Sequence, residues 1–355
     1  MRLVVKIGSN VLSSRNGGLD RERMASLVAQ VAELVKAGHE VVLVSSGAVA
    51  CGRAIVRPRY KLDEVEQRQL FSAVGQVSLM AIYRELFSAQ GLQMGQVLTM
   101  KENFATRGLY LNQRHCLDVM LRNGIVPVVN ENDTVSVTEL MFTDNDELSG
   151  LLATMVGAEL LVILSNIDGI YDGDPASGKA SVIRTIEPGK DISEYIQPGK
   201  SSFGRGGMLT KSSIAAKVAQ EGIRVMIANG TREGILPALL NAPEDTVHTE
   251  FVPSESEVSS VKKWIAHSDG FAKGKVVINE KAVRALTQKK AASLLMVGVV
   301  AIEGEFEEGD IINIVDASGA PVALGKAGWS SEAAAAQIGA HEVKPLVHYD
   351  YLYIL

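Results

Sequence analysis

The sequence is poor in cysteine and lacks long apolar runs, and each shortage excludes a class of protein. Two cysteines among 355 residues are too few for a disulfide framework, and no Cys-x-x-Cys or Cys/His cluster indicates zinc. No apolar run reaches the roughly 18 residues that cross a bilayer. The opening residues "MRLVVKIGSN" enter an apolar strand without a signal-peptide pattern. A cytoplasmic soluble protein with no membrane partner is therefore expected.

Aromatic residues and net charge are also scarce. Aromatic residues make up 5% of the chain and hydrophobic residues 46%, which is typical of an α/β protein rich in alanine, valine, leucine and isoleucine. The net charge of -6 provides no electrostatic footprint for bulk nucleic-acid or acidic-membrane binding. A chain of 355 residues is long enough for two domains. Small-molecule chemistry is therefore favoured.

Apolar runs alternate with segments of helical period through the first two thirds of the chain. The runs expected as buried strands are 3–7, 40–46, 125–130, 159–166 and 223–228. The segments expected as helices are 21–38, 64–89, 109–124, 145–158 and 208–222. This alternation predicts an α/β fold with an open, mostly parallel sheet sandwiched by helices.

The composition changes in the last third. A polar, proline-bearing stretch at 241–262 reads as a linker or a peripheral hairpin, and short strands with turn signals follow it. These strands predict a second, small and mostly β domain. We therefore expect a first domain at 1–252, a linker at 253–270 and a second domain at 271–355.

Polar residues gather where the predicted parallel strands end, which is where such sheets bind ligands. Lys6 closes the first strand, Ser46 and Gly47 follow the second, "NENDTVS" follows "IVPVV", and "TDNDE" opens the next helix. Singly, a strand-end lysine is usually solvated, and such polar clusters are usually turns or helix caps. Their joint placement along one sheet edge predicts a binding site.

The stretch "GRGGMLTKS" at 204–212 is a glycine-rich loop before a helix. It is not a P-loop, because Thr210 stands where that motif needs a glycine before the lysine. Lys6 and Lys211 would supply two fixed positive charges, the glycines an anion-binding nest, and Mg²⁺ the remaining charge, with Asp146 holding the lysines in place. This set of residues suits phosphoryl transfer.

Five stretches, "VVKIGSNVL", "VSSGAVACG", "VPVVNENDTV", "TDNDELS" and "GRGGMLTK", resemble in this order the amino acid kinase family, specifically its members that act on glutamate. The tail "GVVAIEGEFEEGDIINIVDASGAPVALGKAGWSSEAAAAQIG" resembles a PUA domain, so the likeness covers essentially the whole chain. The resemblance implies ATP-dependent phosphorylation of the L-glutamate side-chain carboxylate to γ-glutamyl phosphate, the first step of proline biosynthesis. It also implies that Mg²⁺ is carried by ATP, with no metal site assigned to the protein.

Two alternatives stay open at this point. One is a sibling kinase with another acceptor, since the fold alone does not choose the acceptor. The other is an RNA-binding PUA protein whose kinase domain has degenerated. Decay should remove the costly charged residues first, whereas Lys6, Asp146 and Lys211 are all present. Their presence favours an enzyme.

The resemblance also assigns roles to individual residues. It implies catalytic roles for Lys6, Lys211 and Asp146. It implies substrate contacts from Ser46, Gly47, Asn130, Asp133 and Asn145, among which a carboxylate such as Asp133 suits the substrate ammonium. It implies ATP contacts from Lys6, Gly8, Ser165, Asn166, Arg205, Gly206, Gly207, Met208, Leu209, Thr210 and Lys211.

The ATP site departs from the family pattern at two places. Ser165 and Asn166 stand where the family commonly has Thr-Asp, and Arg205 and Leu209 replace small hydroxyl residues. We expect activity to survive with an altered nucleotide affinity.

The resemblance alone implies two further partners. These are proline, as a feedback inhibitor, and other copies of the same chain in a homo-oligomer. RNA binding by the PUA tail is not favoured, because residues 262–355 hold ten Lys plus Arg and eleven Asp plus Glu. Basic residues of this tail gather within 273–290, and they are Lys273, Lys275, Lys281, Arg284, Lys289 and Lys290. No aromatic residues that could stack on bases lie between them, whereas single-strand binding would favour such residues. Regulation or assembly is the expected role of the tail.

Overall fold

The computed structural model describes residues 1–14, 18–135, 142, 144–174, 180–190, 208–255, 264–265, 272–288 and 292–355. The chain divides into two compact units, Met1–Asn103 with Leu111–Glu257, and Phe104–Tyr110 with Val258–Leu355. Each unit has its own sheet and its own hydrophobic core. The boundaries expected at 252 and 270 stay predictions, since most of 253–270 lies outside the described residues.

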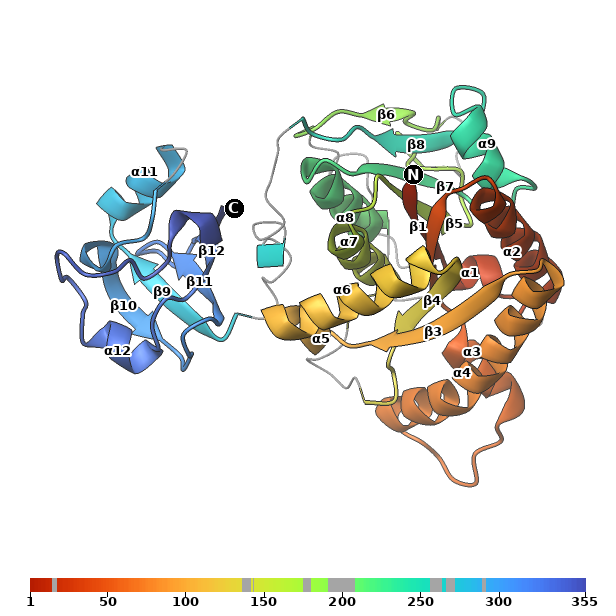
Figure 1. The fold of residues 1–355 in the computed structure, drawn as a ribbon, viewed down its shortest axis with the longest axis horizontal. Coiled ribbons are helices and arrows are strands. Elements are labelled where there is room, and N and C mark those ends of the chain that lie inside the picture. The colour runs from red at the N-terminus through yellow and green to blue at the C-terminus, as the bar shows by residue number, and fades with distance from the viewer. Residues whose placement is uncertain are drawn as a thin grey trace. The chain divides into compact units, whose positions relative to one another are not determined.

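In the described part of the first unit, the strands form one sheet in the order β3-β4-β2-β1-β5-β7-β8-β6 (Figure 1). From β3 to β7 every neighbouring pair is parallel, whereas β8 runs antiparallel beside β7. The predicted open and mostly parallel sheet is confirmed. Its strands are β1 (Arg2–Ile7), β2 (Glu40–Ser45), β3 (Gln93–Thr99), β4 (Ile125–Glu131), β5 (Leu160–Ser165), β6 (Thr185–Ile186), β7 (Arg224–Asn229) and β8 (His248–Phe251).

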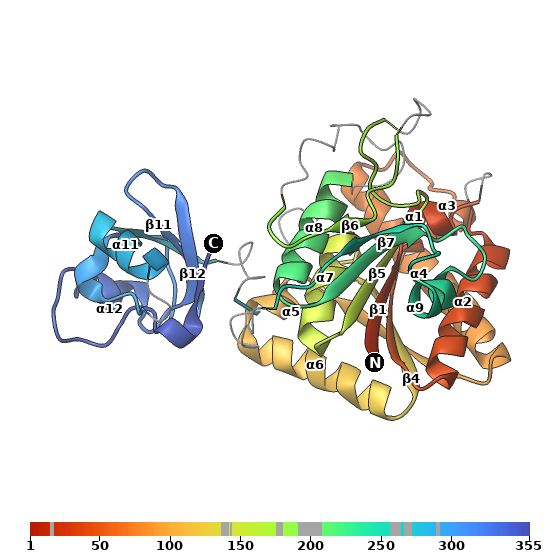
Figure 2. The same cartoon turned by 90° about the horizontal axis from the view of Figure 1, so that it is seen from above.

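Helices cover both faces of this sheet (Figure 2). On one face Leu3, Val5 and Ile7 of β1 join a core with α2 (Arg21–Lys36), α4 (Glu64–Ala89) and α9 (Ile235–Asn241). The other face carries α6 (Arg107–Arg122), α7 (Asn145–Val156) and α8 (Met208–Gln220). Successive side chains of a strand point to opposite faces, so Lys6 points toward α7. Among the described residues, no helix is long and apolar enough to cross a membrane.

Helix α3 (Ala48–Ile55) crosses α4 at very short range through two glycines. A Cβ built at Gly75 would lie 1.9 Å from the Ala48 carbonyl oxygen, and one at Gly52 would lie 1.8 Å from that of Phe71. Real Cβ atoms do not approach backbone so closely, so α3 would have to move. The start of α3 lies directly after Ser46 and Gly47, so this contact bears on the candidate site.

We expect Gly75→Ala to lower the free energy of unfolding by about 1–3 kcal/mol, because the added methyl group forces two backbones apart. Chemical unfolding in urea measures the loss. Gly108→Ala is the matched control, since a Cβ at Gly108 in α6 meets nothing within 4 Å. A loss in Gly75→Ala no larger than in the control would contradict the close-contact explanation.

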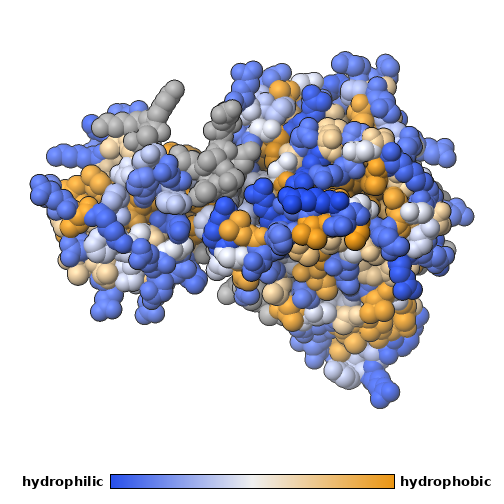
Figure 3. All heavy atoms as spheres, in the orientation of Figure 1, coloured by the Kyte–Doolittle hydropathy of each residue, from blue (hydrophilic) through white to orange (hydrophobic). Residues whose placement is uncertain are grey.

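The α3 and α4 region also exposes apolar side chains. Ile55 is 54% exposed, Tyr60 68% and Val77 71%, and Figure 3 shows hydrophobic surface over this part of the molecule. A hydrophobic surface of this kind often contacts another protein. The expected homo-oligomer stays a prediction, and this surface is a candidate for its subunit interface.

The second unit is built on a sheet in the order β10-β9-β11-β12-β13. Its core includes Val276, Ile312, Leu346 and Val347. Its elements are β9 (Gly274–Ile278), α11 (Glu280–Gln288), β10 (Val299–Glu303), β11 (Ile311–Val315), β12 (Pro321–Lys326), α12 (Ser331–Ala335) and β13 (Leu352–Ile354). The predicted small, mostly β domain is confirmed.

Several basic residues of this unit pair with nearby carboxylates. Lys275 lies 2.6 Å from Glu303, and Lys273 lies 3.3 Å from Asp310. Arg284 pairs with Glu280 one helical turn away. These pairs reduce the local positive charge that RNA binding would need, and the unfavoured RNA role stays untested.

Candidate active site

A cleft of about 670 Å³ opens at the carboxyl edge of the main sheet. It is bounded by the ends of β1, β2, β4 and β5 and by the first turns of α3, α7 and α8. Ten residues singled out from the sequence line it, namely Lys6, Gly8, Ser46, Gly47, Asn130, Asp133, Asn145, Asp146, Ser165 and Lys211. Segments that are far apart in the sequence thus meet at one edge, as the strand-end pattern predicts.

Among the described residues, three predicted nucleotide contacts do not line this cleft. Asn166 is exposed beside Ser165, and neither Met208 nor Thr210 belongs to the cleft lining. Arg205, Gly206 and Gly207 lie outside the described residues, as does the side chain of Leu209. Their nucleotide contacts therefore stay predictions.

Two lysines from distant elements meet on one buried carboxylate. Lys6 Nζ from β1 lies 2.6 Å from Asp146 Oδ1, and Lys211 Nζ from the first turn of α8 lies 2.9 Å from Oδ2 of the same residue. The Asp146 side chain is 1% exposed, against 6% for Lys6 and 12% for Lys211. Each carboxylate oxygen takes one ammonium group, so Asp146 fixes both cations at the cleft wall.

The two lysines also determine the charge state of Asp146. Burial opposes its ionisation, but the charges of Lys6 and Lys211 outweigh burial and hold the pKa of Asp146 below its ordinary value. The neighbouring Asp144 behaves in the opposite way, because burial and the charge of Asp146 raise its pKa. Asp146 is therefore ionised, and the combined formal charge of Lys6, Lys211 and Asp146 is plus one.

Asp144 caps the helix that carries Asp146. Its Oδ1 accepts the backbone N–H of Asp146 at 2.8 Å and that of Glu147 at 3.1 Å. A carboxylate at this position satisfies two otherwise unpaired donors and favours the helix start. The capping role that a cluster such as Asp144, Asn145 and Asp146 usually plays is thus met by Asp144, while its two neighbours point to the cleft.

Two glycines, Gly8 and Gly47, line the cleft. A Cβ at Gly8 would lie 3.5 Å from Lys6 Nζ and 3.1 Å from the Leu164 carbonyl oxygen. Gly47 precedes α3 with a φ of 106°, a conformation that side-chain-bearing residues rarely adopt. Gly8 thus keeps the backbone open to a ligand that approaches Lys6, whereas position 47 needs a glycine for its backbone conformation.

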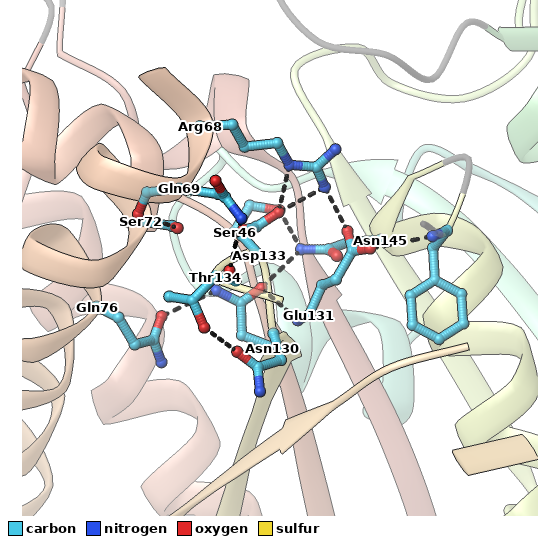
Figure 4. Close-up of polar contacts among 12 residues, drawn as sticks. Ser46, Arg68, Gln69, Ser72, Gln76, Asn130, Glu131, Asp133, Thr134 and Asn145 are labelled. Carbon is cyan, nitrogen blue, oxygen red and sulfur yellow. Dashed lines mark hydrogen bonds and ion pairs between the residues drawn. The ribbon is translucent and has the colours of Figure 1, made fainter. Parts of the chain in front are cut away.

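A chain of side-chain amides crosses the floor of the cleft (Figure 4). Asn145 Nδ2 donates to the Ser46 hydroxyl at 2.9 Å and to Asn130 Oδ1 at 3.2 Å. Asn130 Nδ2 donates in turn to Gln76 Oε1 of α4 at 3.0 Å. Because the Nδ2 group of Asn145 is used in this chain, its Oδ1 is the atom it can offer to a ligand.

An arginine of α4 holds the opposite wall (Figure 4). Arg68 Nε donates to Asp133 Oδ1 at 2.6 Å, and Arg68 Nη2 donates to Glu131 Oε2 at 2.7 Å. Glu131 Oε1 accepts the backbone N–H of Phe142 at 3.0 Å. Asp133 is therefore fixed by a cation that no sequence motif had indicated.

Three residues of this site were missed from the sequence, namely Arg68, Gln76 and Glu131. Glu131 lies inside the quoted "NENDTV", and its place between Asn130 and Asp133 was a usable signal. Arg68 and Gln76 lie within the long helix α4, where nothing in the local sequence marks them.

Two family models match this chain. The family model described as the amino acid kinase family matches residues 1–229, and the PUA domain model matches residues 274–349. The chain belongs to the amino acid kinase family. Members of this family are kinases, so the predicted transferase with a C-terminal PUA domain is confirmed.

Relatives within the amino acid kinase family match almost the whole chain. Glutamate 5-kinase from Bacteroides thetaiotaomicron is 62% identical, over 99% of this chain and 98% of the relative. Glutamate 5-kinase from Chlorobaculum tepidum is 46% identical, over 100% of this chain and 97% of the relative. Among solved structures, UMP kinase from Bacillus anthracis is similar to this chain with a TM-score of 0.50 and 15% sequence identity. The match covers 71% of this chain and 95% of the UMP kinase chain, and at this identity the similarity concerns the fold alone.

Proposed function

We propose that this protein transfers the γ-phosphoryl group of ATP to the side-chain carboxylate of L-glutamate, the first step of proline biosynthesis. The observation that carries the proposal is the placement of two lysines on one buried aspartate, beside a pocket of amide, hydroxyl and carboxylate groups. The relatives that match nearly the full chain carry the name glutamate 5-kinase.

The lysine side of the cleft suits the transferring phosphoryl group. Charge builds up on its equatorial oxygens as the bond to ADP breaks and the bond to the carboxylate oxygen forms. Lys6 and Lys211 would stabilise that charge, because Asp146 already holds both in position and little reorganisation is needed. The attacking carboxylate carries no proton at neutral pH, so the reaction requires no general base.

The opposite wall suits an amino acid acceptor. Asp133 would take the ammonium group of L-glutamate, while the Ser46 hydroxyl and the first turn of α3 face its carboxylates. Asn145 lies between the two walls and would contact the acceptor through its Oδ1. These assignments need the acceptor to lie between Asp133 and Lys6.

Mg-ATP fits the groups that are present. Gly8 leaves space beside Lys6 for phosphate oxygens, and the two ammonium groups complement their negative charge. Among the described residues, no group of three or more His, Cys, Asp or Glu side chains could hold a metal ion. We propose that Mg²⁺ enters on the phosphates of ATP, where it offsets their charge.

An acceptor screen tests the proposal. The protein is supplied with Mg-ATP and candidate acceptors, and the acyl phosphate is trapped with hydroxylamine. Hydroxamate is expected from L-glutamate and not from L-aspartate or N-acetylglutamate. ADP formation that does not depend on L-glutamate would contradict the proposal.

Regulation and assembly can be examined with the same preparation. L-Proline added to the assay is expected to inhibit, and light scattering is expected to give a mass above that of one chain. Uninhibited activity in the presence of proline, or a monomer, would contradict these two expectations without affecting the proposed reaction.

A further inference from the structure

We propose that Arg68 determines the acceptor specificity of this kinase, by positioning Asp133 and by setting the charge of the acceptor wall. The inference rests on the proposed function and adds to it a residue from a different element. Arg68 lies on the second turn of α4, whose start is fixed by a capping box between Asp63 and Glu66. The arginine therefore sits on a rigid element and not on a loop.

The geometry gives Arg68 two partners at once. Its Nε reaches Asp133 and its Nη2 reaches Glu131, at 2.6 Å and 2.7 Å. The Arg68 side chain is 17% exposed, Glu131 5% and Asp133 12%. Charge-assisted bonds of this length with little exposure hold a side chain firmly, so Asp133 has one preferred position at the cleft wall.

The same helix secures the backbone around Asp133. Gln69 follows Arg68 in the helix, and its Nε2 donates to the Thr134 carbonyl oxygen at 2.9 Å. Glu131 is tied to Phe142 as well as to Arg68, which links this wall to the residues before α7. Helix α4 thus supports the loop on both sides of Asp133, through the charged group of Arg68 and the amide of Gln69.

The charge balance explains why an arginine is needed. Arg68, Glu131 and Asp133 together carry a charge of minus one, which attracts the ammonium group of an amino acid. L-Glutamate as a whole also carries minus one, so a wall at minus two would repel its carboxylates. Arg68 keeps the wall negative enough for the ammonium and not so negative that it repels the rest of the acceptor.

The test compares Arg68→Met, Arg68→Lys and the double variant Arg68→Met with Glu131→Gln. In Arg68→Met the KM for L-glutamate is expected to rise about 10- to 100-fold, because Asp133 is no longer held where it binds the acceptor ammonium group. The turnover number and the KM for ATP should stay within about threefold, since the loss concerns acceptor binding. The ratio of the inhibition constant of N-acetylglutamate to the KM for L-glutamate should fall about tenfold, because Asp133 no longer selects for a free ammonium group.

The other variants separate charge from position. Arg68→Lys keeps the charge without the two-pronged contact, so its KM should lie between those of the wild type and Arg68→Met. The double variant returns the wall to minus one and should recover part of the lost affinity. Arg84→Met, on the exposed side of the same helix, is the control and should match the wild type.

Several outcomes would overturn the inference. One is a KM for L-glutamate within twofold of the wild type in both Arg68→Lys and Arg68→Met. Another is a KM for ATP that rises as much as the KM for L-glutamate, and the third is a double variant with no recovery of glutamate affinity. If Arg68→Met does not fold, Arg68→Lys and the double variant decide by the same criteria. Hydroxamate formation by the wild type is measured first, so a failure of the proposed acceptor is seen separately, and the variants are then compared with whichever amino acid is phosphorylated.

Discussion

Replacing Lys211 by alanine is expected to lower the turnover number by about 10²- to 10³-fold, or about 3–4 kcal/mol in the activation free energy, by analogy with the loss of one oxyanion donor. The physical reason is that, in the proposed reaction, Lys211 stabilises charge that develops only as the phosphoryl group transfers. Asp146 holds the ammonium group at 2.9 Å, so it needs no rearrangement during the reaction. The KM for L-glutamate should change little, because the acceptor wall is built from other residues.

Steady-state kinetics on purified protein make this measurement. Lys217→Ala is a matched control in the last turn of the same helix and should keep the turnover number within about threefold. Lys211→Arg should recover only part of the rate, since a planar guanidinium does not reproduce the compact ammonium. A variant Lys211→Ala with a raised KM and an unchanged turnover number would show that Lys211 only binds.

The central strands of the sheet could be predicted because each is a continuous apolar run. β1 and β5 are buried almost throughout, which is typical of parallel strands covered on both faces. Three other strands of the main sheet, β3, β6 and β8, were not recognised. β3 is an edge strand that carries Gln93, Gly95 and Gln96 in place of an apolar run, and β8 is four residues long inside a polar stretch. Both owe their place to pairing with a neighbour, which local sequence does not encode.

The candidate site divides along the same line. Lys6, Ser46 and Asn130 could be placed together from sequence, because the ends of parallel strands share one edge. Arg68 and Gln76 could not, because their contacts with Asp133 and Asn130 span 65 and 54 residues. Those contacts join α4 to the end of β4 and the residues after it, so they depend on the path of the whole chain.

Replacing Asp146 by asparagine is expected to lower the free energy of unfolding by about 3–5 kcal/mol, since it leaves two buried ammonium groups without their counter-charge. The substitution keeps the size and shape of the side chain, so the loss reports on charge. Chemical unfolding at neutral pH gives the value. Glu85→Gln breaks an exposed pair with Arg21, whose side chains are 67% and 57% exposed, and should cost about 1 kcal/mol at most.

The pH dependence of the same loss tests its origin. The pKa of Asp146 lies below its ordinary value in the folded protein, so its ionised form stabilises the fold above the unfolded pKa. That contribution disappears as the pH falls through the lower folded value, and the difference between wild type and Asp146→Asn should therefore narrow in acid.

Anion binding supplies the converse test. Inorganic pyrophosphate is expected to raise the melting temperature of Asp146→Asn more than that of the wild type, because Lys6 and Lys211 then lack a competing carboxylate. A stability loss that is the same at every pH, with no extra stabilisation by pyrophosphate, would mean that Asp146 acts through packing and not through the charges of the two lysines.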